Sequence, residues 1–93
     1  MNGEPLRRNV LIANPHGFHM RPMAAFARRA EDFQSTVTVY HEGRSVNGKS
    51  IWDLMLLGAP QGCELTIEAD GPDAPQAIDA LAAILGAPAP EGN

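Results

Sequence analysis

Hydrophobic and polar residues alternate along some segments of the chain and follow a helical spacing along others. Alternation is typical of half-buried strands, whereas apolar residues three or four positions apart are typical of amphipathic helices. These patterns predict strands at 9–13, 36–40, 44–46 and 65–69. They predict helices at 20–31, at 51–57 and between Asp73 and Gly86.

Residues that start and stop helices support these boundaries. Pro22 suits the first turn of a helix, because the N–H that it lacks would have no partner there. Ser50 and Asp73 are good N-cap residues, and Gly58 and Gly86 are good residues for ending the helices that follow them. The short apolar segment after Ser50 is therefore predicted as a helix.

The predicted order of elements is βαββαβα, with half-polar strands and amphipathic helices. This order predicts an α+β fold, an open-faced β-sandwich in which a four-stranded antiparallel sheet carries three helices on one face. At 93 residues the chain is long enough for one domain and too short for two. We expect a single domain over 1–93, with a core at about 8–86 and a flexible tail at 87–93.

Composition and charge narrow the classes of function. A formal net charge of −4 argues against a nucleic-acid partner, although arginines cluster locally enough to form a basic patch for a small anion or an acidic partner. Cys63 is the only cysteine, which excludes an intrachain disulfide and fits a reducing cytoplasm. No signal peptide or membrane-spanning stretch is visible, so we expect a cytoplasmic protein without membrane insertion.

The junction of the first predicted strand and helix carries the most informative chemistry. His19 stands where a helix N-terminus offers free amides and a positive dipole end, which favour a neutral, nucleophilic imidazole and would stabilise an attached phosphoryl group. Arg21 can pair with phosphate oxygens, and Gly17 permits a close turn. For a lone histidine, the alternative is a polar cap or a surface loop residue.

Two sequence motifs extend this interpretation beyond one histidine. The first is the run Gly17, Phe18, His19, Met20, Arg21, Pro22, and the second is Asn47, Gly48, Lys49, Ser50, Ile51. With the same order of elements, they make the chain from about Arg8 to Leu85 resemble the HPr family, the histidine-containing phosphocarriers of the bacterial sugar phosphotransferase system.

The resemblance implies a specific role for His19. Its Nδ1 would accept a phosphoryl group that enzyme I takes from phosphoenolpyruvate, and would pass it to a histidine of an EIIA-type acceptor. Arg21 would steady the phosphoryl oxygens, with Gly17 and Met20 beside them. The protein would then be a stoichiometric carrier rather than an enzyme, without cofactor or metal, and we expect a monomer.

The resemblance also implies a regulatory site and a docking surface. Ser50 would match a serine that an HPr kinase/phosphorylase modifies, although a helix cap with no further role explains this serine equally well. The short predicted helix would dock partners beside the histidine. The candidate docking residues are Met20, Ala24, Ile51, Trp52, Met55 and Leu56, and burial in the core is the alternative for Trp52 and Met55.

Three departures from the family pattern put partner choice in question. Met20 and Trp52 are larger than usual, and Gly48 stands where alanine is common. The alternative function is a regulatory phosphoprotein of a nitrogen-type or incomplete phosphotransferase system that feeds no sugar import. A metal site formed by His16, His19 and His41 is a weaker hypothesis, because no cysteine or suitably spaced carboxylate accompanies them.

Overall fold

The computed structural model of the chain describes residues 4–13, 18 and 20–86. Its elements follow one another in the predicted order. They are β1 (Leu6–Leu11), α1 (Met20–Ala30), β2 (Thr36–His41), β3 (Arg44–Asn47), α2 (Ile51–Met55), β4 (Glu64–Asp70) and α3 (Ala74–Gly86). The predicted tail at 87–93 lies outside the described residues.

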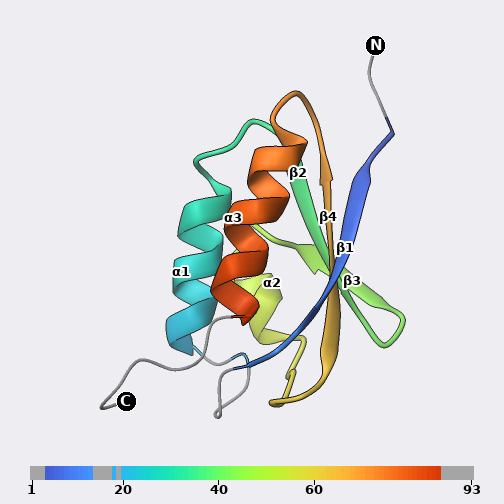
Figure 1. Cartoon of the computed structure of the whole chain (residues 1–93). Helices are drawn as coiled ribbons and strands as arrows, with labels where there is room; N and C mark the ends of the chain where they lie inside the picture. The colour runs from blue at the N-terminus through green and yellow to red at the C-terminus, as the bar shows by residue number, and fades with distance from the viewer. Residues whose placement is uncertain (1–3, 14–17, 19, 87–93) are drawn as a thin grey trace.

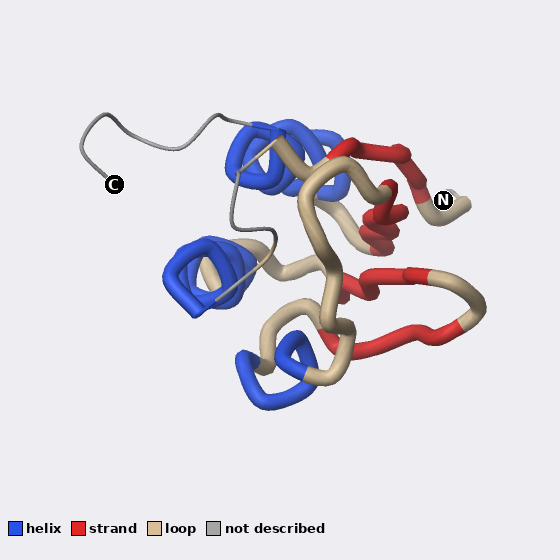
Figure 2. The backbone as a smooth tube through the Cα atoms, turned by 90° about the horizontal axis from the view of Figure 1, so that it is seen from below, coloured by secondary structure: helices blue, strands red, loops and turns tan. Residues whose placement is uncertain are grey.

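The four strands form one sheet in the order β1-β4-β2-β3, and each neighbouring pair is antiparallel. The helices cover one face of this sheet, as two perpendicular views show (Figures 1 and 2). β4 lies between β1 and β2, so the last strand of the sequence becomes central. The predicted α+β open-faced sandwich is confirmed.

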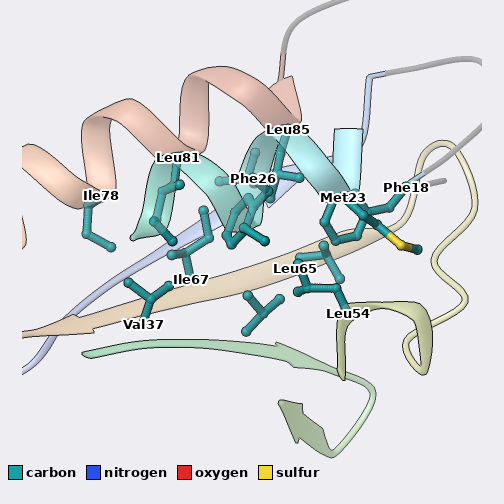
Figure 3. Close-up of a cluster of buried hydrophobic side chains, with 14 of the residues drawn as sticks. Phe18, Met23, Phe26, Val37, Leu54, Leu65, Ile67, Ile78, Leu81 and Leu85 are labelled. Carbon is teal, nitrogen blue, oxygen red and sulfur yellow. The ribbon is translucent and has the colours of Figure 1, made fainter. Parts of the chain in front are cut away.

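The core lies between the helices and the covered face of the sheet (Figure 3). Along β4, buried residues alternate with more exposed ones, as expected for a strand with one covered face. Leu65 and Ile67 of this strand are completely buried, and so are Phe26 of α1 and Leu81 of α3. These residues of β4, α1 and α3 therefore belong to one core between the sheet and the two long helices.

The first strand differs from its predicted bounds. It begins at Leu6, not Asn9, and ends at Leu11. The residues added at its start include two arginines, so this part of the strand lacks the apolar alternation on which the prediction rested. Their charges are satisfied across the fold, because Arg7 pairs with Glu68 at 3.1 Å and Arg8 pairs with Asp79 of α3 at 2.7 Å.

The short helix also ends earlier than predicted, at Met55 instead of Leu57. Leu57 is still buried, with 4% of its surface exposed, so its hydrophobicity reflects a core position after the helix. Gly58 follows with a φ of +59°, a left-handed conformation that glycine adopts without steric penalty. Because α2 ends at Met55 with Leu56 as its C-cap, the prediction that Gly58 directly ends this helix is wrong.

Candidate functional site

The predicted active segment enters α1 from a residue anchored in the core. Phe18 has only 3% of its surface exposed, and its ring meets that of Phe26 edge-on, with centroids 5.8 Å apart. Its backbone amide donates a hydrogen bond to the carbonyl of Ala59 at 2.8 Å. Two of the predicted site residues, Gly17 and His19, lie outside the described residues.

α1 begins at Met20, so Arg21 and Pro22 occupy its first turn. Both residues follow the expected pattern: Pro22 needs no donor there, and Arg21 is exposed. No acidic residue lies in the first turn of α1 to neutralise the positive end of the helix. An anion near this helix end would therefore meet both the dipole and an accessible guanidinium.

Ser50 caps α2, as its place in the sequence predicts. Its backbone is extended, with φ −116° and ψ 115°, and its hydroxyl accepts a hydrogen bond from the amide of Asp53 at 3.2 Å. The preceding turn is stabilised by Asn47, whose side-chain oxygen accepts from the Lys49 amide at 2.9 Å. The capping role of Ser50 is thus confirmed, and its phosphorylation stays a prediction.

Most of the large apolar residues predicted to dock partners are exposed. The exposed fraction is 75% for Trp52 and 41% for Met55, so the alternative that these two residues belong to the core is wrong. Met20 and Leu56 are also exposed, whereas Leu54, which lies between Trp52 and Met55 in α2, is fully buried. We call Trp52, Met55 and Leu56 the α2 surface.

The remaining docking candidates, Ala24 and Ile51, are half-buried and lie together at the junction of α1 and α2. Both line a shallow hollow of about 240 Å³. Arg28 and Lys49 line the same hollow, although sequence reasoning did not select them for docking. The sequence shows that Lys49 directly precedes Ser50. Arg28 lines the same hollow only because the fold packs α1 beside α2.

The arginines do not form a single patch. Arg7 and Arg8 lie on β1 and are held in ion pairs with acidic residues of β4 and α3. Arg29 pairs with Asp32 at 2.7 Å and stacks on the ring of Phe33. The basic character near the predicted site therefore comes from α1 and Lys49, not from the N-terminal arginines.

The third histidine of the metal hypothesis, His41, belongs to the core side of β2. It has 8% of its surface exposed, its Nδ1 has no hydrogen-bond partner, and its Nε2 lies 3.9 Å from the Glu42 carboxylate. In the described part of the chain, no group of three or more potential ligands could hold a metal ion. His16 and His19 lie outside that part.

None of the helices among the described residues has the length and apolar character needed to cross a membrane.

Comparison with known families identifies the fold and the motif together. A family model described as the phosphorylation site of the HPr component of the phosphotransferase system matches residues 6–87. The chain belongs to the HPr family. HPr proteins are phosphocarriers of the phosphotransferase system, and the suspected resemblance is thereby confirmed.

Individual HPr proteins are similar over nearly their whole length. The chain is 39% identical to the phosphocarrier protein HPr of Buchnera aphidicola over 85% of this chain and 93% of the relative. It is 41% identical to HPr of Haemophilus influenzae over 84% and 92%. The crystal structure of HPr from Bacillus anthracis superimposes with a TM-score of 0.85, at 32% identity, over 89% of this chain and 99% of that one.

Proposed function

We propose that this HPr protein carries a phosphoryl group on Nδ1 of His19 between enzyme I and EIIA-type acceptors. In the first transfer, the bond from phosphorus to a histidine nitrogen of enzyme I breaks as the bond to His19 forms. The second transfer repeats this exchange toward the acceptor. The protein acts as a stoichiometric carrier, without a cofactor, as a monomer in the cytoplasm.

One observation supports this proposal most directly: α1 begins immediately after the motif histidine, with an exposed arginine in its first turn. Pro22 has no N–H, so the free amides at this end are those of the residues before it. Arg21 can neutralise charge on the phosphoryl oxygens during both transfers. Positioning and neutralisation are what phosphoryl transfer chiefly requires of a protein.

The core contacts of Phe18 supply the positioning. Its ring is fixed against Phe26 and its amide against Ala59, so the chain entering α1 is held at a buried point. A fixed entry to α1 leaves less conformational freedom to be lost when the first turn of this helix meets a partner.

The decisive experiment is incubation with enzyme I and phosphoenolpyruvate labelled in the phosphoryl group. We expect label that is labile in acid and stable in base on the wild type, and none on His19→Ala. His16→Ala is the matched control, because it removes a histidine three positions away in the sequence and should keep the label. Label that persists in His19→Ala would overturn the proposal.

Docking of these partners is assigned to the α2 surface, together with Met20, Ala24 and Ile51. Exposed apolar side chains of this size are typical of the centre of a protein interface. Arg28 and Lys49, which line the adjacent hollow together with Glu31, would complement acidic residues of a partner.

Regulation is assigned to Ser50, as the substrate of an ATP-dependent HPr kinase/phosphorylase. Ser50 is half-buried and its hydroxyl accepts a hydrogen bond from the Asp53 amide, a contact that competes with transfer of a phosphoryl group to the same oxygen. We expect acid-stable label from ATP on the wild type and none on Ser50→Ala.

A further inference from the structure

Asp53 forms hydrogen bonds with two residues of the segment that precedes α2, Ser50 and Asn47. Its amide donates to the Ser50 hydroxyl at 3.2 Å, and its carboxylate accepts from the amide of Asn47 at 3.3 Å. The side chain therefore folds back over the N-terminal end of α2, toward the residues that precede the helix. The sequence shows Asp53 only as an acidic residue three positions after the serine.

The carboxylate stays close to the hydroxyl. Even if fully extended, the covalent bonds from the Asp53 amide to its carboxyl carbon span less than about 4 Å. Added to the hydrogen bond to Ser50, this places the two groups within the Debye length of about 8 Å at physiological ionic strength. A negative charge introduced on Ser50 would therefore lie within one Debye length of the Asp53 carboxylate, where solution ions screen the repulsion only in part.

No cation offsets this charge by an ion pair among the residues that the structure describes. Lys49 is adjacent to Ser50 in sequence, but its ammonium donates to the carbonyl of Phe33 at 2.8 Å, on the side of α1. Asp53 is half-buried, its carboxylate accepts from the Asn47 amide, and its place in the first turn of α2 sets its charge near the positive end of the helix.

We propose that Asp53 opposes phosphorylation of Ser50 by electrostatic repulsion. In the modification, the bond from the γ-phosphorus of ATP to its bridging oxygen breaks, the bond to Ser50 Oγ forms, the hydroxyl proton passes to a base of the kinase, and ADP leaves. Both the approaching phosphate and the phosphoserine meet the Asp53 charge. The proposal rests on the proposed modification of Ser50.

The test compares initial rates of acid-stable labelling by an HPr kinase with labelled ATP. Asp53→Asn keeps an oxygen that can accept from the Asn47 amide and removes only the charge. We expect its rate to exceed that of the wild type about tenfold at low salt, the factor that a like-charge energy of about 1.4 kcal/mol gives. Because the effect is electrostatic, this ratio should fall toward one in 0.5 M salt, roughly a Debye length of 4 Å.

Asp79→Asn is the matched control, because Asp79 is an exposed acid that pairs with Arg8 on the other side of the fold. Its labelling rate should equal that of the wild type. Equal rates for the wild type and Asp53→Asn, or a rate increase that salt leaves unchanged, would overturn the proposal.

A second readout separates this inference from the carrier function. Labelling of the histidine through enzyme I should be the same in the wild type and Asp53→Asn. If neither protein is labelled by a kinase that labels an authentic HPr substrate, the Ser50 modification and the role of Asp53 both fail, while the histidine assay still decides the carrier function on its own.

Discussion

The carboxylate of Asp73 accepts hydrogen bonds from both the amide and the hydroxyl of Ser35, at 3.0 and 2.6 Å. The amide of Gln34 donates to the same carboxylate at 2.9 Å. Ser35 is fully buried, and a side-chain carbon at Gly71 would come within 2.6 Å of its Cα. This junction fixes the entry of β2 against the start of α3, and only glycine fits at position 71.

The junction predicts a pH-dependent contribution to stability. The hydrogen bonds from the Ser35 hydroxyl first, and then from the Gln34 amide, lower the pKa of Asp73 from its ordinary value of 3.8. A lowered folded-state pKa means that the stabilisation is present above pH 3.8 and is lost as the pH falls through the folded value. We expect Asp73→Asn to lower the free energy of unfolding at pH 7, and the difference from the wild type to narrow below pH 3.8.

Urea unfolding between pH 7 and pH 3 measures this difference. Asp79→Asn serves as the control, because its carboxylate is exposed and makes a single ion pair, with Arg8. A deficit of Asp73→Asn that stays constant across the whole pH range would contradict the assignment of the pKa to these hydrogen bonds.

Gly48 is fixed by packing, which explains its departure from the alanine common in the family pattern. A side-chain carbon there would lie 2.5 Å from Cγ1 of Val37 and 3.2 Å from Cε1 of Phe26. We expect Gly48→Ala to lower the free energy of unfolding by about 1–3 kcal/mol, the usual range for overpacking. The loss should be smaller in a Val37→Ala background, because the neighbouring methyl group is then gone.

Chemical denaturation of the four proteins of this cycle gives the coupling energy directly. Gly86→Ala is the control, since the nearest atom to its added carbon is 3.8 Å away. A coupling energy of zero between positions 37 and 48 would show that the contact does not decide the residue at 48.

Trp52 should affect binding much more than folding. With 75% of its surface exposed, its truncation removes little from the core, so Trp52→Ala should change the free energy of unfolding by less than about 0.5 kcal/mol. If it docks enzyme I, the KM for phosphoryl transfer should rise about tenfold, as for a residue worth about 1.4 kcal/mol at an interface. Leu11→Ala is the matched control, because Leu11 is a similarly exposed apolar residue on β1, with 62% exposed. Equal KM values for the two variants would remove Trp52 from the docking surface.

The hairpin between β2 and β3 contains local backbone strain. Glu42 has a φ of +49° and Gly43 a φ of +81°, so both central residues of this two-residue turn are left-handed. Asparagine tolerates this conformation better than glutamate. We expect Glu42→Asn to raise the free energy of unfolding by about 0.5–1 kcal/mol, measured by thermal and urea unfolding. A decrease would show that the Glu42 carboxylate near His41 contributes more than the strain.

The sequence by itself determined the order of elements and the family motif. Strand alternation in β4 and the apolar stripes of α1 and α3 are local patterns, and each element must bury one face whatever lies opposite. The cap at Ser50 was equally predictable, because its bond to the Asp53 amide joins residues only three positions apart. These features depend on interactions between residues that are close together in the sequence.

Tertiary structure alone decided which apolar and charged residues are free to meet partners. Leu54 and Trp52 are only two positions apart in one helix, yet Leu54 is completely buried and Trp52 is largely exposed. The extent of β1 was hidden for the same reason, because Arg7 and Arg8 are accommodated by Glu68 and Asp79, which lie far along the chain. Such pairings depend on how the layers pack together, so no local pattern of hydrophobic and polar residues could contain them.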